Sequence, residues 1–372
     1  MSGTDSAMLL ALHFAALSLP TLLVSGPAGV RTDRIGCEKV LIQAQWALLG
    51  AGLLGALSIP LFVGNAQVAM LLASTLLMGI AGAYELTARN KYCALLVEEP
   101  QKLAPYLTSF SVVFNVGKLV GPPLGGWLVA FTGPTTALTL DALTYVLPIA
   151  SVIWLLKPIR SLEQLSSNTN AATLKSAWQE CGPMLRHVLK FTGLICVVGF
   201  FHPGLAPLIA ANTLGPSPQD LGLFTSVLAA GSITGGIVLQ RNSHKFSSRP
   251  GLTLGCFALI TAVAQLGMAS STLIPIVLLM VWLIGAGTAG LLSSANLITQ
   301  VGSKQVIRGR MAGLSQIAFL GGGGLSGLIA AQLTITLGLQ ATFAIAGGIG
   351  LILSLGEIWR RGGMTMNVVK SA

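Results

Sequence analysis

Three polar residues lie inside long apolar stretches, where they can act on an ion or a small molecule. Lys118 lies about 14 residues into one stretch, roughly 21 Å at 1.5 Å per residue, and Asn115 precedes it by one helical turn. Asp141 lies about 7 residues into the next stretch, roughly 10 Å deep. A charge inside a membrane costs about 2.5–3.5 kcal/mol on insertion scales, so such residues indicate binding, proton transfer or pairing.

Each of these three residues has a structural alternative. Lys118 either takes part in substrate binding or conformational coupling, or forms a buried ion pair, for which Asp141 is a candidate partner. Asp141 alternatively relays a proton, or lies close enough to the interface to reach water. Asn115 is a polar group of a cavity or an ordinary packing residue.

A fourth candidate is an acid and a base spaced one helical turn apart. Glu85 precedes Arg89 by four residues, which places the two side chains on one helix face. We favour a structural ion pair between them. Arg34 is an alternative partner for Glu85 from another helix.

The composition requires an apolar solvent around these groups. Hydrophobic residues make up 53% of the 372 residues and charged residues only 9%, whereas soluble domains carry about 25% charged residues. The apolar runs are long enough to span a bilayer. We therefore predict an all-α polytopic membrane protein with about eleven transmembrane helices, at 7–28, 41–63, 66–87, 104–130, 134–156, 189–211, 219–240, 251–270, 272–297, 311–336 and 339–360.

The basic residues predict the orientation. Twenty of the 21 lysines and arginines fall in alternate loops, and Lys118 is the exception. By the positive-inside rule those loops are cytoplasmic, so the C-terminus lies inside and the N-terminus outside. A net charge of +10 also suits nucleic acid. That partner is excluded because the charges are divided among six short loops instead of gathered on one domain.

A polar segment divides the chain into two halves. We expect an N-terminal bundle over 1–156, a cytoplasmic linker over 157–188 and a C-terminal bundle over 189–372. A faint repeat with an offset of 207 residues carries Gly29 onto Gly236 and Gly117 onto Gly324. Repeated halves around a central site are typical of transporters.

Two short motifs have a physical interpretation of their own. In the segment 29–39 we expect a tight charged loop whose acid and base cap helix ends or latch the two halves; the alternative is an ordinary basic loop. In the stretch 117–128, glycines four apart allow close helix contact and a proline bends the helix, which suits a hinge or simple tight packing. The motif residues are Gly29, Asp33, Arg34, Gly36, Gly117, Gly121, Pro122, Gly125 and Gly126.

These motifs resemble those of the major facilitator superfamily. The segment 29–39 is similar to the signature loop after transmembrane helix 2, although Arg31, Cys37 and Glu38 depart from its usual pattern. The stretch 117–128 matches every fixed position of the helix-5 motif of antiporters and exporters. The resemblance implies a two-bundle fold that works by alternating access, and transport in the direction of export.

Two further segments resemble the bacterial exporter group of enterobactin and macrolide efflux proteins. One begins at Thr87, where proline is usual in the group, and contains Arg89; the other contains Arg308 and Arg310. In that group the segment Thr4–Leu12 corresponds to the outer loop entering helix 2. The resemblance therefore implies that the usual first helix is absent, through a late start or a truncation.

The expected function is secondary active export of a small amphipathic molecule (siderophore-, drug- or metabolite-like) across the bacterial cytoplasmic (inner) membrane, coupled to protons. The alternatives are a non-transporting truncated paralogue, and a lipid flippase or passive channel. The sequence has no nucleophile–base constellation, P-loop or metal-ligand spacing. We therefore expect no enzyme, no cofactor and no metal. The expected partners are a substrate, a coupling ion and membrane lipid, and relatives of this fold usually work as monomers.

Overall fold

The computed structural model describes residues 3–95, 113, 116–117, 120–121, 124–155, 174–199, 202–303 and 308–364. All of its regular elements in these ranges are helices. The first part of the chain forms α1 (Gly3–Ser18), α2 (Pro20–Ile35), α3 (Cys37–Leu61), α4 (Gly64–Leu95), α6 (Pro134–Thr144) and α7 (Val146–Leu155). The second part forms α9 (Leu174–Glu180), α10 (Pro183–Gly199), α11 (His202–Thr213), α12 (Pro218–Arg241), α13 (Ser243–Ser248), α14 (Pro250–Ser270), α15 (Ile274–Val301), α16 (Arg308–Gln316), the π-helix η2 (Ile317–Gly321), α17 (Gly322–Leu337) and α18 (Leu339–Arg361).

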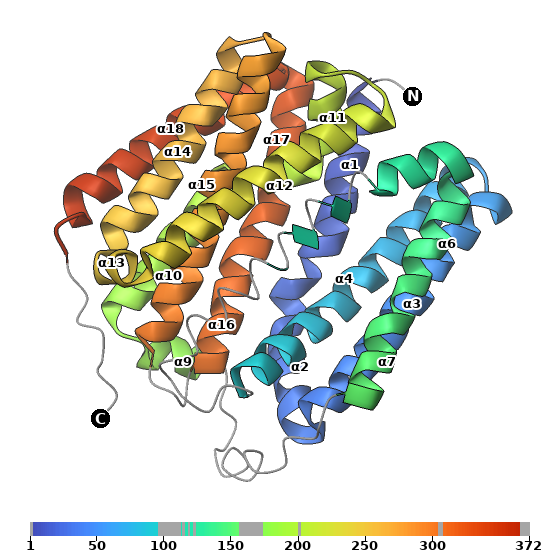
Figure 1. The fold of residues 1–372 in the computed structure, drawn as a ribbon, viewed down its shortest axis with the longest axis horizontal. Coiled ribbons are helices and arrows are strands. Elements are labelled where there is room, and N and C mark those ends of the chain that lie inside the picture. The colour runs from blue at the N-terminus through green and yellow to red at the C-terminus, as the bar shows by residue number, and fades with distance from the viewer. Residues whose placement is uncertain are drawn as a thin grey trace.

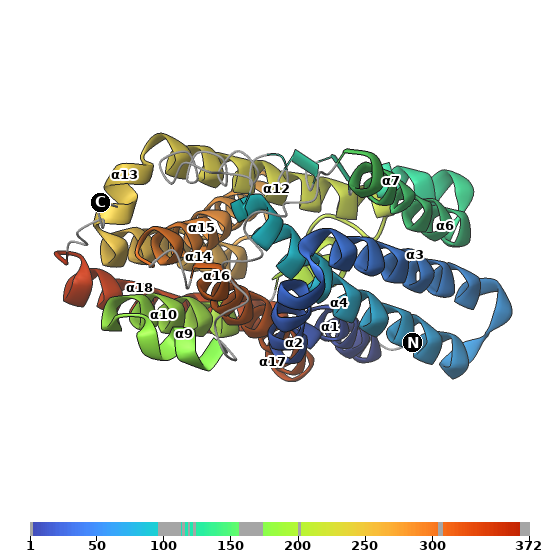
Figure 2. The same cartoon turned by 90° about the horizontal axis from the view of Figure 1, so that it is seen from below.

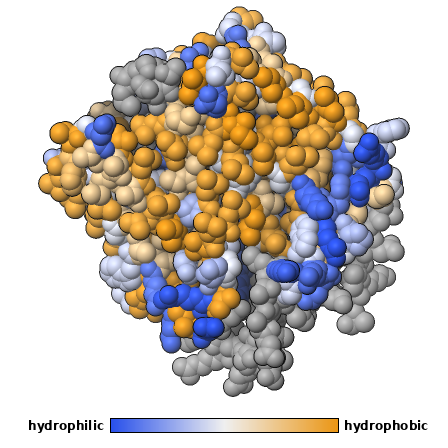
Figure 3. Space-filling view, turned by 180° about the vertical axis from the view of Figure 1, so that it is seen from behind, coloured by the Kyte–Doolittle hydropathy of each residue, from blue (hydrophilic) through white to orange (hydrophobic). Residues whose placement is uncertain are grey.

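The all-α membrane architecture is confirmed. Within the described residues, ten helical segments are long and apolar enough to span a bilayer, and each overlaps one predicted range. The remaining predicted helix, 104–130, lies mostly outside the described residues, although 124–132 is helical. Apolar side chains cover most of the face seen in Figure 3, and hydrophilic ones gather mainly toward its lower end and right edge.

The helices form two groups that lie side by side (Figures 1 and 2). We call α1–α7 the N-terminal half and α9–α18 the C-terminal half. They meet where α1 packs on α11 and α17, where α2 packs on η2, and where α16 contacts α2 and α4. Phe14 of α1 illustrates this contact, because a Cβ atom at Gly204 of α11 would lie 3.1 Å from its ring.

The predicted loop at 29–39 is a helix for most of its length, so that expectation was wrong. α2 continues to Ile35 and α3 starts at Cys37, which leaves Gly36 as the whole connection. Gly36 has φ 91° and ψ 152°, a conformation that residues with a Cβ avoid. The chain therefore reverses at one glycine. The charged residues of 29–39 lie at the end of α2 and at the start of α3.

The segment predicted as a linker also contains helical structure. α9 and the first residues of α10 fall within 157–188, so the first long helix of the C-terminal half starts at Pro183, earlier than predicted. Proline suits the first turn of a helix because its missing N–H has no intrahelical acceptor there. The Arg186 guanidinium donates to the carbonyls of Gln179 and Cys181, which fastens α9 to α10.

Several long helices are interrupted along their length. α1 gives way to α2 at Leu19, and α6 gives way to α7 at Tyr145. The helix from Arg308 to Leu337 contains the π-helical turn η2. Interrupted helices at membrane depth are tolerated where protein or a cavity surrounds the freed backbone groups. The break at Tyr145 lies at the candidate site.

Candidate functional site

The predicted ion pair between Glu85 and Arg89 is confirmed. The Arg89 Nη1 atom lies 3.3 Å from Glu85 Oε1, and the two side chains are 28% and 15% exposed. Glu85 lies ten residues from the end of α4, roughly 15 Å at 1.5 Å per residue. Arg34, the alternative partner, is exposed and forms no ion pair with Glu85 in the part of the chain that the structure describes.

The pair borders a cavity of about 590 Å³ within the N-terminal half. Side chains from α1, α3, α4 and the α6–α7 junction line it, and its apolar wall includes Leu48 and Met78. The polar lining consists of Gln45, Glu85, Arg89, Thr144 and Tyr145. A mainly apolar cavity of this size with a few converging polar groups is typical of a small-molecule site.

Two polar lining residues were not identified from the sequence. Gln45 lies on the buried face of α3 with Leu41, Ala44 and Leu48, where an amide breaks an apolar pattern at helical spacing. Tyr145 lies at the break between α6 and α7, and its N–H bonds the carbonyl of Ala142 at 3.1 Å. That shortened turn places Tyr145 at the cavity. Pro148, three residues later, has no N–H to bond the carbonyl of Thr144, and it is the local signal that could have predicted the break.

Of the three proposed substrate or coupling residues, the structure describes only Asp141. Its side chain is exposed and it precedes Tyr145 by four residues, but it does not line the cavity. The Thr144 hydroxyl donates to the Asp141 carbonyl at 2.6 Å. Lys118 and Asn115 lie outside the described residues, so the pairing of Asp141 with Lys118 remains a prediction.

The residues of the 29–39 segment lie at the end of α2. Gly29 and Arg34 belong to α2, Gly36 forms the connection, and the backbone of Asp33 is helical while its side chain lies outside the description. The Arg31 guanidinium donates to Gln43 Oε1 of α3 at 2.8 Å, across the reversal. Arg308 and Arg310 lie at the start of α16, and their side chains also lie outside the description.

The glycine stretch 117–128 makes one close contact between the halves. A Cβ atom at Gly126 would lie 3.1 Å from the carbonyl oxygen of Pro218, at the start of α12. Equivalent Cβ atoms at Gly117, Gly121 and Gly125 meet nothing described within 4 Å, so the close contact expected along one face occurs only at Gly126. Pro122 lies outside the described residues.

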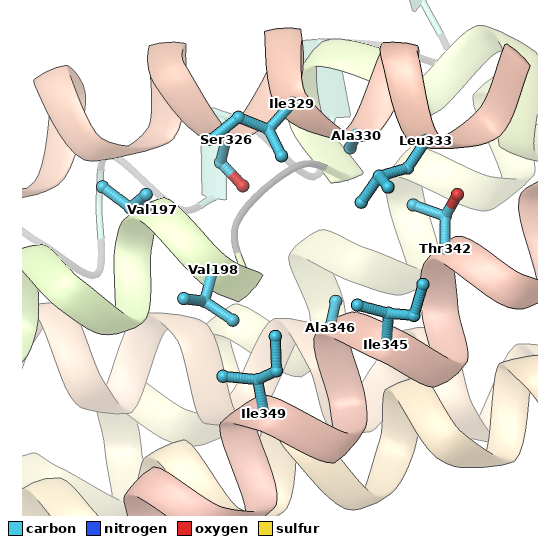
Figure 4. Close-up of a pocket in the computed structure, with 10 residues that line it drawn as sticks. All are labelled: Val197, Val198, Ser326, Ile329, Ala330, Leu333, Thr342, Ile345, Ala346 and Ile349. Carbon is cyan, nitrogen blue, oxygen red and sulfur yellow. The ribbon is translucent and has the colours of Figure 1, made fainter. Parts of the chain in front are cut away.

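A second hollow lies in the C-terminal half, between α10, α17 and α18 (Figure 4). It measures about 110 Å³, and its labelled side chains are apolar except Ser326 and Thr342. The Thr342 hydroxyl is already engaged, because it donates to the Gly338 carbonyl at 2.9 Å and lies 3.1 Å from the Thr334 hydroxyl. The hollow therefore lacks converging polar groups.

The sequence analysis also missed a buried acid in the C-terminal half. Glu357 of α18 is 6% exposed, and both of its carboxylate oxygens lie 2.9 Å from Nε2 of His187 in α10. The two residues are 170 positions apart, so no local pattern predicts their contact. The pair joins the first long helix of this half to its last.

Comparison with known families identifies this two-group helical architecture. A family model described as MFS_3, transmembrane secretion effector, matches residues 2–359. The chain belongs to the major facilitator superfamily. It is therefore a secondary transporter integral to a membrane, and it is not an enzyme.

Relatives in sequence and in structure agree with this membership. The chain is 26% identical to the multidrug efflux pump Tap of Mycobacterium tuberculosis over 349 residues, 88% of this chain and 79% of the pump. It is 27% identical to macrolide efflux protein A of Streptococcus pyogenes over 245 residues, 63% of this chain and 58% of that protein. The fold matches the xylose transporter XylE of E. coli with a TM-score of 0.74 at 13% identity, over 100% of this chain and 90% of XylE.

Proposed function

We propose that this transporter exports a small amphipathic molecule by alternating access of its two halves, coupled to protons. The observation that carries the proposal is the cavity in the N-terminal half, where an apolar wall meets the Glu85–Arg89 pair. The apolar wall suits the apolar part of a transported molecule, and the polar groups of the cavity suit its polar part. Tap is named as a multidrug efflux pump and the streptococcal relative as a macrolide efflux protein, which supports the direction of transport.

The proton coupling rests on acids within the spans. Glu85 and Asp141 each lie in a membrane-spanning segment, and intramembrane carboxylates are the usual proton carriers of transporters. Protonation of Glu85 removes its attraction for Arg89, which frees the guanidinium to interact elsewhere. We retain Lys118 and Asn115 as further groups of the same pathway. Gly29, Asp33, Arg34, Gly36 and the glycines of 117–126 then serve the change of conformation.

The proposed orientation follows the basic residues. The ends of α2, α4, α12 and α18 that carry Arg34, Arg89, Arg241 and Arg361 face the cytoplasm in this proposal. The C-terminus is then cytoplasmic, and the membrane is the inner membrane of a bacterium. The proposed working unit is a monomer, because the two halves that would move against each other belong to the same chain.

The test uses the purified protein in liposomes of defined pH gradient. A trapped fluorescent cation such as ethidium should move against its own gradient when a proton gradient is imposed. A protonophore should abolish that movement. Transport that survives the protonophore would overturn the proton coupling, and downhill movement alone would indicate a channel in place of an exporter.

A further inference from the structure

The end of α18 packs against the beginning of α14, which brings basic residues of both helices together. Arg360 and Arg361 end α18. A Cβ atom at Gly251, in the first turn of α14, would lie 2.8 Å from the Cβ atom of Arg361. Arg249 directly precedes α14. Because the two backbones approach so closely, the guanidinium groups extend from neighbouring points of the surface.

The short helix α13 adds a further cation beside them. The Thr253 hydroxyl of α14 donates to the Phe246 carbonyl of α13 at 2.9 Å, and the ring centroids of Phe246 and Phe257 lie 5.8 Å apart. These contacts hold α13 against α14, at the same edge of the molecule as the end of α18 (Figures 1 and 2). Lys245 of α13 is exposed. We call these four cations the basic corner: Lys245, Arg249, Arg360 and Arg361.

The positive charge of the basic corner is not neutralised within the described residues. None of its four side chains forms an ion pair in that part of the chain. Glu357, one turn before Arg361 on α18, already binds His187 of α10 at 2.9 Å. Asp220 lies in the first turn of α12, at the far end of that helix from α13. Like charges that lie close together create a field that attracts an anion.

The basic corner lies directly beyond an apolar surface of α18. Ile352, Leu355 and Trp359 are exposed and follow one another at helical spacing within a membrane-spanning segment, so they face lipid. Trp359 is 86% exposed and immediately precedes Arg360. Tryptophan is enriched where a bilayer meets water. The surface therefore changes from apolar to aromatic to cationic over about two turns of α18.

We propose that the basic corner binds the headgroup of an anionic phospholipid, phosphatidylglycerol being the simplest, whose acyl chains lie along the exposed side of α18. A guanidinium presents several N–H donors in a planar fork that matches a phosphate, and basic pockets between membrane helices bind anionic headgroups. Free phosphate would use the cations alone, whereas a lipid also covers the apolar surface. The proposal requires only that the chain spans a membrane, so it is independent of the cargo.

The test measures lipid selectivity at Trp359, which lies between the cations and the apolar surface. The protein is reconstituted in phosphatidylcholine bilayers with increasing fractions of dibrominated phosphatidylglycerol or dibrominated phosphatidylcholine, because bromine quenches tryptophan fluorescence on contact. The difference between each protein and the same protein with Trp359→Phe isolates the signal of Trp359 from those of the other tryptophans.

The expected result is a preference for phosphatidylglycerol that depends on the basic corner. Arg249→Gln combined with Arg361→Gln should lower the preference about tenfold, or about 1.4 kcal/mol, because two cations that attract the headgroup are lost. Lys245→Gln, a single exposed substitution, should lower it about threefold by the same argument. Arg249→Lys combined with Arg361→Lys retains both charges and should retain most of the preference.

Arg34→Gln combined with Lys175→Gln is the matched control, because it removes the same charge from exposed positions on α2 and α9. It should leave the preference unchanged. Equal losses in the two double glutamine variants would show diffuse attraction by net charge in place of a site. Equal quenching by both brominated lipids would show that the corner binds no anionic lipid. Loss of the preference in inorganic phosphate, but not in chloride at equal ionic strength, would show that the ligand is free phosphate.

Discussion

The two halves of the molecule differ in the space and polar groups that their interiors enclose. In the C-terminal half, α12 and α15 approach so closely that a Cβ atom at Gly231 would overlap the Trp282 carbonyl, and one at Gly285 would overlap that of Leu228. The hollow described there is small and apolar. The N-terminal half surrounds a larger cavity lined by an ion pair, a tyrosine and a glutamine.

The difference separates a half that is held together by close helix packing from a half that has room to bind a molecule. Helices in lipid gain little from burying apolar surface against one another, so small residues and close backbone contact hold them together. The C-terminal half uses that contact fully and its buried acid is paired within the protein. The N-terminal half leaves space and polar groups for a guest. Substitutions in the C-terminal half should therefore lower stability, and substitutions in the N-terminal half should lower transport.

The largest effect is expected at the α12–α15 contact. Gly231→Val should lower the free energy of unfolding by about 3 kcal/mol, because the new side chain meets backbone that has no room to move. Unfolding in detergent can be followed with a thiol-reactive dye, since Cys37, Cys93, Cys181 and Cys196 are buried.

Gly236→Val on the same helix is the control, because nothing described lies within 4 Å of a Cβ atom at Gly236. Equal melting temperatures for the two valine variants would show that α12 and α15 are not in close contact.

The His187–Glu357 pair tests whether the acid of the C-terminal half is structural. His187→Leu should lower the free energy of unfolding by about 2 kcal/mol, since it leaves a buried carboxylate without its hydrogen-bond donor. Thermal unfolding in detergent measures the change. Glu357→Gln, which removes the charge and keeps an acceptor, should cost less than half as much. A loss of transport at full stability would instead place this pair in the transport pathway.

Glu85 should show the opposite balance. Glu85→Gln should lower the rate of proton-driven ethidium transport about tenfold, equivalent to about 1.4 kcal/mol. Its effect on the free energy of unfolding should stay below about 1 kcal/mol, because glutamine has the same size and keeps an acceptor for the Arg89 guanidinium. Initial rates in liposomes and melting in detergent measure the two effects.

The exposed Glu180→Gln in α9 is the matched control for removing one carboxylate. If Glu85→Gln transports at the normal rate, the acid contributes neither to cargo binding nor to coupling.

The smallest effect is expected where Gly126 approaches Pro218, between the two halves. Gly126→Ala should slow transport roughly twofold, about 0.5 kcal/mol, because the methyl group tightens the approach to the Pro218 carbonyl without blocking it. Transport rates in liposomes provide the measurement. Gly125→Ala, which meets nothing described within 4 Å, should transport normally. A twofold loss in both variants would point to helix flexibility as the cause.

The sequence was most informative where structure depends on neighbouring residues. Apolar runs predicted the spans, and the four-residue spacing of Glu85 and Arg89 predicted their ion pair, because both follow from helical geometry alone. The one-residue connection at Gly36 was missed because charged residues in 29–39 suggest a loop, although helix ends accommodate them equally well. The position of Gln45 beside the cavity and the pairing of Glu357 with His187 depend on helices distant in sequence, which a single sequence does not reveal.

The π-helical turn at Ile317–Gly321 has a geometric consequence for the helix that contains it. A π turn holds about one residue more than an α turn, so every side chain beyond it is rotated by roughly 100° about the axis relative to an uninterrupted α-helix. Before the turn, α16 contacts α2 and α4; after it, a Cβ atom at Gly324 would lie 2.6 Å from the Ser18 hydroxyl of α1 and 3.0 Å from Leu19. The helix therefore contacts the N-terminal half on both sides of the turn. Deleting a single residue from this turn would rotate Gly324 away from α1 and leave the helix from Arg308 to Leu337 continuous.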